Sequence, residues 1–197
     1  MNYALLLAAG RSTRMGEQNK LRMPYRGKPI VYHAAKAYLD AGLSVLVVLG
    51  HEAEAVKMML PDSKRISTIL SPRYALGLSF SLSMGLRNLP SEARWVIVGL
   101  GDMPMVQSTT IARLAAATRS SGAYAIVPTF MSEWGNPVAL APYMVQECLN
   151  LQGDRGAGQI LRQYPNLVEE MDTADEGVVR DVDTPELYNH LRRLDRY

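Results

Sequence analysis

The segment Leu7–Lys20, LAAGRSTRMGEQNK, contains the residues best suited to binding an anion. It begins at the end of an apolar run, and small residues that let backbone N–H groups approach phosphate oxygens follow at Gly10, Ser12 and Gly16. Arg11, Arg14 and Lys20 add fixed positive charge, which would stabilise the negative charge that a triphosphate develops on its bridging oxygen during attack at the α-phosphorus. We expect this loop to hold a compact anion, although such a loop can also be a plain solvated connection.

The spacing in this loop differs from the two common glycine-rich phosphate motifs. Ser12 occupies the second glycine position of G-x-G-x-x-G, and Glu17 follows Gly16 where a P-loop has lysine. The stretch from Arg11 to Lys28 still holds six basic residues and one acid. The whole chain has a net charge of only +2, so we expect neither nucleic acid nor an anionic membrane as its principal partner. The expected ligand is a small anion.

Two carboxylate-bearing segments are candidates for binding a divalent cation. Asp102 lies in LGDMP, directly after the apolar run Trp95–Leu100. Asp181 and Asp183 form a D-x-D pair, and side chains two residues apart in an extended segment point the same way. Because hard cations prefer oxygen ligands, we expect Asp102 and Asp183 to bind one Mg2+. The alternatives are that Asp102 belongs to an ordinary turn and that Asp183 starts a helix.

Other polar residues give weaker signals. Asn136 precedes a proline, and its amide is suited to a nucleotide or acceptor, although Asn before Pro is also common in turns. Asp154 lies in a second glycine-rich loop, Gly153–Gly158, which would present a helix N-terminus to an anion or simply link two helices. Ser79 and Ser81 would contact base or ribose, or lie at a helix start. The three histidines lack metal-ligand spacing, so no zinc site is expected.

Short apolar runs alternate with segments of helical period, which indicates βα units packed on a mainly parallel sheet. The expected strands are Tyr3–Ala8, Ser44–Leu49, Ile66–Leu70, Trp95–Leu100, Ala123–Pro128, Asn136–Leu140 and Leu167–Met171. The expected helices are Pro29–Ala41, Glu52–Leu60, Leu78–Leu89, Thr109–Arg119, Pro142–Leu149, Ala157–Tyr164 and Pro185–Leu194. Since ligands bind beyond the carboxyl ends of strands in such sheets, the loops after Ala8 and Leu100 should face one crevice.

The whole-chain composition indicates one α/β domain spanning residues 1–197, with 48% hydrophobic residues to form its core. Cys148 is the single cysteine, so an intrachain disulfide is impossible and a reducing cytoplasm is the expected compartment. The apolar start Ala4–Ala9 has no basic region before it, which fits neither a signal peptide nor a membrane span. We expect it to be part of the fold.

Six motifs resemble those of the MobA-like NTP transferases, in the same order: LAAGRSTRMG with Lys20, GLSFSLSMGL, LGDMP, GNPV, GDRGAG and DVDTPE. The resemblance spans Leu7 to Glu186 and is greatest to the molybdenum-cofactor cytidylyltransferase branch. It implies a Rossmann-like, three-layer α/β nucleotidyltransferase domain. It also implies Mg2+ at Asp102 and Asp183, triphosphate contacts from Lys20, and an acceptor side at Asn136 and Asp154. The nucleotide contacts would come from Leu7, Ala8, Ala9, Gly10, Arg11, Ser12, Gly16, Ser71, Ser79, Ser81 and Gly101.

The sequence departs from the family pattern in two places. Position 187 is Leu where many relatives have an acid, which weakens any role for the final helix and leaves Asp183 unaffected. Ala8 and Ala9 stand where the guanylyl branch usually has a double glycine, and the segment Gly77–Ser81 replaces its Pro-Leu-Ala-Gly base loop. These differences favour CTP over GTP.

The expected reaction is attack by an acceptor phosphate oxygen on the α-phosphorus of a magnesium-bound NTP, with Lys20 and Arg14 stabilising charge. Phosphate monoesters are largely ionised at pH 7, so no protein nucleophile is needed. The resemblance implies molybdopterin, the pterin of the molybdenum cofactor, as acceptor, and a molybdoenzyme as a possible client. The alternatives are a sugar phosphate or alcohol phosphate acceptor, or a non-catalytic nucleotide-binding protein that matures a cofactor.

Overall fold

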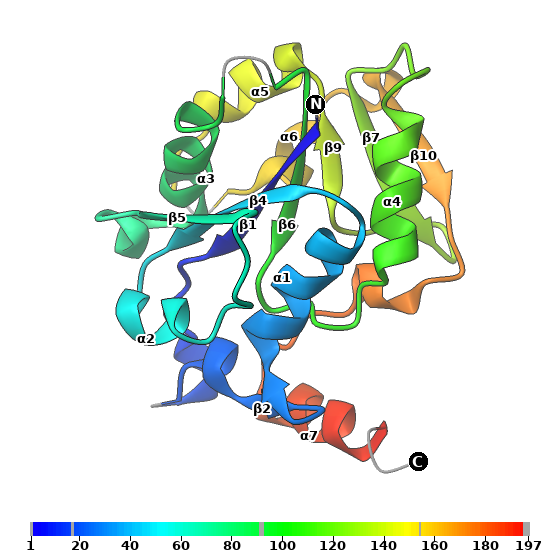
Figure 1. The fold of residues 1–197 in the computed structure, drawn as a ribbon. Coiled ribbons are helices and arrows are strands. Elements are labelled where there is room, and N and C mark those ends of the chain that lie inside the picture. The colour runs from blue at the N-terminus through cyan, green and yellow to red at the C-terminus, as the bar shows by residue number, and fades with distance from the viewer. Residues whose placement is uncertain (1, 17, 91–92, 154, 195–197) are drawn as a thin grey trace.

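A mixed β-sheet forms the centre of the computed structural model, which describes residues 2–16, 18–90, 93–153 and 155–194 (Figure 1). Strand β1 (Asn2–Ala8) lies between β4 (Ser44–Leu49) and β6 (Trp95–Leu100), and all three run parallel. The chain passes from β1 to β4 on one side and returns to β6 on the other. This change of side opens a crevice at the carboxyl ends of β1 and β6.

The sheet order is β10, β7, β9, β6, β1, β4, β5, with β8 paired to β7. Its other strands are β5 (Ile66–Leu70), β7 (Ala125–Phe130), β8 (Glu133–Trp134), β9 (Val138–Leu140) and β10 (Val168–Asp172). Strand β9 is antiparallel to β6 and β7, and β8 is antiparallel to β7, whereas the other neighbours are parallel. The sheet is therefore mainly parallel.

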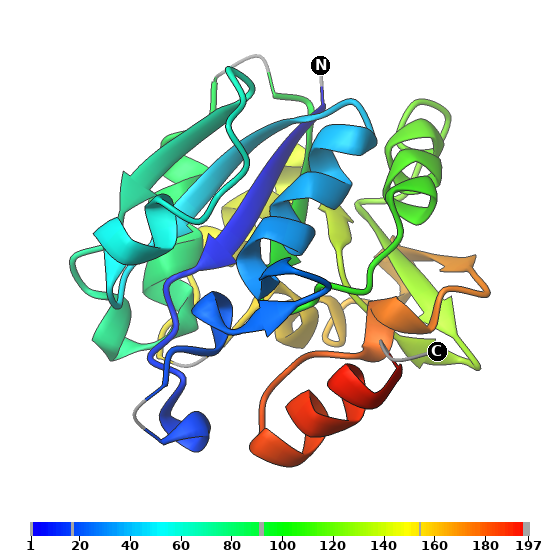
Figure 2. The same ribbon diagram turned by 60° about the horizontal axis from the view of Figure 1, so that its bottom comes forward.

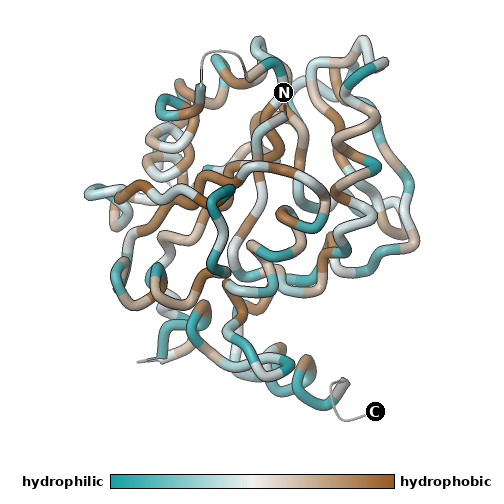
Figure 3. Tube along the Cα trace, viewed as in Figure 1, coloured by the Kyte–Doolittle hydropathy of each residue, from teal (hydrophilic) through white to brown (hydrophobic). Residues whose placement is uncertain are grey.

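Helices cover both faces of this sheet. One layer consists of α1 (Ile30–Asp40), α2 (Ala53–Lys57) and α4 (Ser108–Ala117), and the other of α3 (Leu78–Arg87), α5 (Pro142–Leu149) and α6 (Ala157–Leu161). Alternate residues of β1 pack into the two layers, Leu6 with α1 and Leu5 with α3. The hydropathy-coloured trace shows hydrophobic residues concentrated in the central strands (Figure 3).

The C-terminal helix α7 (Pro185–Leu194) lies outside these layers, beside the loop that follows β1 (Figure 2). Its buried Tyr188 and Leu191 form a small core with Met15 of that loop and with a hairpin of β2 (Pro24–Tyr25) and β3 (Lys28–Pro29). The Tyr188 hydroxyl also donates to the carbonyl of Pro24 at 2.8 Å. This packing brings the D-x-D segment, which precedes α7, to the first loop.

The structure confirms the predicted Rossmann-like, three-layer α/β fold, and every predicted strand and helix has a counterpart. Element ends differ by a few residues. The helix expected over Glu52–Leu60 is limited to α2, because Glu52 has a left-handed backbone (φ 51°) and Pro61 follows soon after. The strand expected from Asn136 begins at Val138, after a proline that has no N–H to donate. Among the described residues, no helix is long and apolar enough to cross a membrane.

Candidate active site at the carboxyl edge of the sheet

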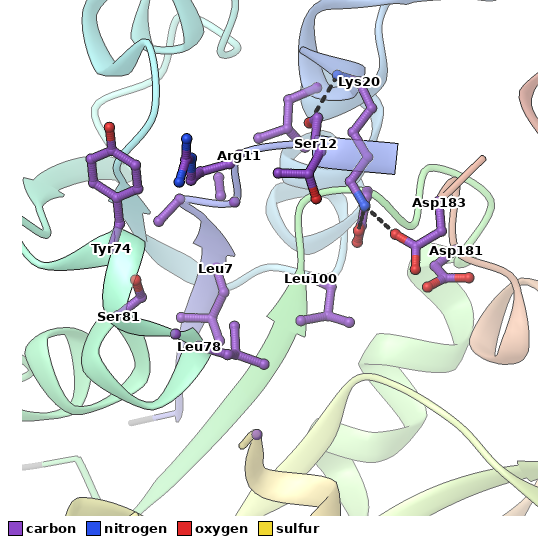
Figure 4. Close-up of a pocket in the computed structure, with 18 of the residues that line it drawn as sticks. Leu7, Arg11, Ser12, Lys20, Tyr74, Leu78, Ser81, Leu100, Asp181 and Asp183 are labelled. Carbon is purple, nitrogen blue, oxygen red and sulfur yellow. Dashed lines mark hydrogen bonds and ion pairs between the residues drawn. The ribbon is translucent and has the colours of Figure 1, made fainter. Parts of the chain in front are cut away.

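A cavity of about 670 Å³ opens where β1 and β6 end (Figure 4). Its walls come from the first loop, from the segment that leads into α3, from the end of β6 and from the D-x-D segment. The predicted site residues that line it are Leu7, Ala8, Ala9, Gly10, Arg11, Ser12, Arg14, Lys20, Ser81, Asp102 and Asp183. Cavities of this size hold ligands of nucleotide size.

The conformation of the first loop depends on a local network around Ser12. Ser12 adopts a left-handed backbone (φ 54°), and its carbonyl accepts from Met15 N–H at 2.8 Å. Its hydroxyl accepts from the N–H of Lys20 at 3.1 Å, which ties the two ends of the loop together. Buried Asn19 accepts from Leu21 N–H at 3.1 Å and so caps the turn η2 (Lys20–Arg22). Asn19 was missed as a loop-organising residue, and its place before a short turn is the signal that could have found it.

Three aspartates meet at one end of the cavity, from two segments far apart in sequence. One carboxylate oxygen from each of Asp102, Asp181 and Asp183 lies within 4.8 Å of the others. The amine of Lys20 ion-pairs with both Asp102 and Asp183, and Arg14 pairs with Asp183 at 2.5 Å. The structure therefore brings together the predicted cation ligands and the predicted catalytic cations. Asp181 joins them, as expected if the D-x-D pair shares one ion.

The charges in this cluster affect one another strongly. Burial alone would lower the pKa of Lys20, but Asp102 and Asp183 outweigh it and raise that pKa above its usual value. Burial opposes ionisation of Asp183 as well, yet the bonds and charge of Lys20 hold its pKa below the usual range. Burial, followed by the charges of Asp183 and Asp102, raises the pKa of Asp181 to about 6. Lys20 is thus a protonated amine at pH 7, and its side chain, which is 11% exposed, lines the cavity.

The donor set of the three aspartates suits a hard divalent cation such as Mg2+. Oδ1 of Asp102 is buried without a hydrogen-bond partner among the residues that the structure describes. Such an atom is costly unless it meets a cation or a donor. The pKa of Asp181 is raised first by burial and then by the charges of Asp183 and Asp102, and added positive charge would favour its ionised form. The residues present therefore fit a metal ion bound by Asp102, Asp181 and Asp183.

The opposite end of the cavity is less polar. The turn η3 (Tyr74–Leu76) and Leu78 form this wall, and Leu76 is 57% exposed at its edge. Figure 4 shows Tyr74, Leu78 and Ser81 on the side away from the aspartates. The cavity thus has a charged end for phosphates and an apolar end suited to a flat ring.

Four predicted nucleotide contacts lie outside the described wall of this cavity. Ser79 is buried and donates to the carbonyl of Gly153 at 2.7 Å, and Ser71 is buried and bonds to the hydroxyl of Ser81 at 3.3 Å. Gly101 donates its N–H to the carbonyl of Leu7 at 2.9 Å, where an added Cβ would crowd Ala8. Gly16 supplies a turn with φ 70°. These residues shape the site and do not line it.

A second cavity of about 210 Å³ adjoins the first and shares the side chains of Leu7, Leu78, Leu100 and Gln159 with it. Its other walls are largely aliphatic, and Trp134, Asn136 and Arg162 also contribute. Asn136 therefore lies in the cavity that adjoins the first one. Asp154, the other predicted acceptor contact, lies outside the described residues.

The fold and the cavity at the carboxyl edge of the sheet define a class of Rossmann-like α/β proteins, and comparison with known sequences narrows that class. The model of the MobA-like NTP transferase domain matches residues 4–168. The chain therefore belongs to the MobA-like NTP transferases, a family of nucleotidyltransferases.

The individual relatives have different names. The chain is 33% identical to nicotine blue oxidoreductase of Paenarthrobacter nicotinovorans, with 92% of each chain covered. It is 30% identical to purine catabolism protein PucB of Bacillus subtilis, covering 96% of this chain and 95% of PucB. A solved structure of Rv0371c from Mycobacterium tuberculosis, in complex with manganese, has a TM-score of 0.80 and 25% identity over 96% of this chain and 97% of that one.

Proposed function

We propose that this protein transfers the NMP part of an NTP, with CTP favoured, from a magnesium complex to a phosphorylated small molecule and releases pyrophosphate. The observation that carries the proposal is the meeting of Lys20 with Asp102, Asp181 and Asp183 at the end of a cavity lined by the first loop. In that arrangement, the carboxylates that could bind a hard cation, the ammonium group of Lys20 and the backbone of the first loop all border one cavity of nucleotide size.

The nucleotide would lie across the cavity, with its phosphates along residues 8–14 and its base against the wall formed by Tyr74, Leu76 and Leu78. Negative phosphates then lie next to Arg11, Arg14 and Lys20. The apolar surface of the opposite wall would pack against the faces of the base.

In the reaction, an acceptor phosphate oxygen forms a bond to the α-phosphorus while the bond to the bridging oxygen breaks. Pyrophosphate leaves with that electron pair. Lys20, held in place by its ion pairs, stabilises the charge that grows on the phosphate oxygens, and Arg14 adds a second positive charge. A bound Mg2+ would neutralise phosphate charge and help to orient the phosphates. The protein thus contributes position and electrostatics, and no side chain forms a covalent intermediate.

The acceptor would enter from the second cavity, which adjoins the first along Leu7 and Leu100. We propose molybdopterin as this acceptor and a molybdoenzyme as a possible client, in the cytoplasm, on the basis of family membership and of the motifs that resemble the molybdenum-cofactor cytidylyltransferase branch. The side-chain amide of Asn136 could hydrogen-bond to polar groups on the edge of the pterin. Sugar phosphates and alcohol phosphates remain the alternative acceptors, since the nucleotide half of the site would be the same.

Pyrophosphate release tests the proposal. Wild-type protein with CTP, Mg2+ and molybdopterin should release pyrophosphate, and omitting the metal or the acceptor should abolish the release. Asp102→Asn is the matched control, because it keeps the shape of the side chain and removes its negative charge. The proposal fails if folded wild-type protein releases no pyrophosphate with any of the four NTPs and any of the three acceptor classes.

Oxidoreduction is a second candidate function, favoured by the name of the relative that is 33% identical over 92% of the chain. The nucleotide cavity would then hold NADH or NADPH, and the apolar second cavity would hold a flat oxidised substrate. Fluorescence titration separates the two functions. Tight NADPH binding without any effect of Mg2+ favours oxidoreduction, whereas magnesium-dependent CTP binding favours transfer.

A further inference from the structure

The two segments that carry the aspartates run side by side in opposite directions. The N–H of Val182 donates to the carbonyl of Asp102 at 2.9 Å. Further along, Gly177 lies so close to Met105 that an added Cβ would be 2.4 Å from its carbonyl oxygen. The contacts therefore pair residue 102 with 182 and residue 105 with 177, which is an antiparallel arrangement outside the main sheet. Figure 1 shows the C-terminal segment beside the chain that enters α4.

Asp175 links the two antiparallel segments at the end that lies away from the cation ligands. It is 3% exposed, and each of its carboxylate oxygens accepts from a different segment. Oδ1 accepts from Gly177 N–H at 3.0 Å within its own turn, η5 (Glu176–Val179). Oδ2 accepts from Gln107 N–H at 2.9 Å, across to the segment that follows Asp102.

The bond to Gln107 has a second physical effect. Gln107 is the N-cap residue of α4, and its side chain makes no capping bond. The buried carboxylate of Asp175 supplies negative charge at this helix start, where the peptide dipoles favour it. A group with two acceptor oxygens is required here, because both partners are backbone N–H donors.

We propose that Asp175 is a positioning residue for the cation site. By joining the segment after Asp102 to the segment before Asp181, it fixes the separation of carboxylates that come from distant parts of the chain. Asp175 touches neither the cavity nor the reacting groups, so its effect passes through the two segments. The inference rests on the proposed function for the identity of the ligand, a divalent cation.

The substitution Asp175→Asn keeps one of the two hydrogen bonds of this side chain and removes the other. Asparagine keeps one oxygen for Gly177 N–H, but its amide N–H then faces the N–H of Gln107. Mn2+ binding to the nucleotide-free protein, measured by electron paramagnetic resonance, should weaken by about tenfold, the lower end of the effect seen when partners of metal ligands are removed. Cooperative thermal unfolding should persist, which separates lost positioning from lost folding.

Thr173→Val is the matched control, since the Thr173 hydroxyl accepts from Asp175 N–H at 3.2 Å within the same turn and does not cross to the other segment. It should leave the Mn2+ dissociation constant unchanged. Gln107→Pro removes the same cross-segment bond from its other end, and the φ of −78° and exposed side chain at that position accommodate proline. It should weaken Mn2+ binding as Asp175→Asn does, and it decides the question if Asp175→Asn does not fold.

The outcomes separate this inference from the proposed function. If the wild type binds Mn2+ and both Asp175→Asn and Gln107→Pro bind it equally tightly, the positioning role alone is overturned. Absence of Mn2+ binding in the wild type overturns the metal centre of the proposed function, and with it the site that Asp175 would position.

Discussion

Lys20 forms ion pairs with two of the three aspartates of the site. Its amine lies between Asp102 and Asp183, and those carboxylates keep it protonated in spite of its burial. A bound triphosphate would offer the same amine additional negative oxygens. Lys20 can therefore organise the carboxylates and also stabilise phosphate charge.

Replacing Lys20 with Ala should lower turnover by about two to three decades, because the loss of one charge-assisted contact to a transition-state oxygen costs roughly 2–4 kcal/mol. The free energy of unfolding should change far less. Arg22→Ala is the control, since Arg22 is a nearby cation that pairs with Glu52 at the surface, where such pairs contribute little. Steady-state turnover and chemical denaturation check the pair of variants. Near-normal turnover in folded Lys20→Ala would remove Lys20 from the mechanism.

Leu76 tests the proposed orientation of the nucleotide. Leu76→Ala should raise the KM for the NTP several-fold with kcat nearly unchanged, because an apolar side chain that packs on the base binds ground state and transition state alike. Leu70 provides a control of the same residue type and exposure, 56% against 57%, outside the cavity wall. Equal KM values in Leu70→Ala and Leu76→Ala would contradict a base at this wall.

The residues of the site were predictable to different degrees. Lys20, Asp102 and Asp183 could be inferred because each lies just beyond a recognisable strand or in a motif. Asp175 could not, because an aspartate in a turn has the same local pattern whether or not it bonds to a segment some 70 residues away. The apolar surface of Leu76 was missed for a similar reason, since the exposure of a side chain in a short turn depends on the tertiary structure around it.

At the scale of elements, strands with uniform apolar character were predicted well, whereas very short elements were not. The hairpin of β2 and β3 has two residues in each strand, and its Arg26–Gly27 turn lacks the usual Asn-Gly signal although both residues have positive φ. The position of α7 also depends on distant contacts, from Tyr188 and Leu191 to the hairpin region. Local sequence predicts that a helix forms there but not what it packs against.

The segment from Ser71 through the start of α3 should set the choice of base. A pocket that pairs the cytosine amino and carbonyl groups leaves polar groups unmatched when guanine enters, at roughly 1–3 kcal/mol for each group. We therefore expect at least about tenfold preference for CTP over GTP when both compete for limiting acceptor. Because the hydroxyls of Ser71, Ser79 and Ser81 are all engaged in hydrogen bonds and all three residues are buried, selection would come from backbone groups of this segment. Equal incorporation, or preference for GTP, would refute the base assignment and leave nucleotidyl transfer intact.

At the scale of the whole molecule, the order of the strands explains why one reaction site forms from four distant segments. The carboxyl ends of β1 and β6 lie side by side, so the first loop and Asp102 meet there. The return of the chain through η5 to α7 adds Asp181 and Asp183 to the same edge. The adjoining second cavity would give the proposed phosphorylated acceptor a route to the α-phosphorus.

Transfer of label from [α-32P]CTP is the most direct test of this account. With Mg2+ and molybdopterin, wild-type protein should move the label into the acceptor and release one unlabelled pyrophosphate for each label transferred, and Asp102→Asn should do neither. Label that stays in CTP, or that appears as free CMP at a rate independent of the acceptor, would contradict nucleotidyl transfer to molybdopterin at this site.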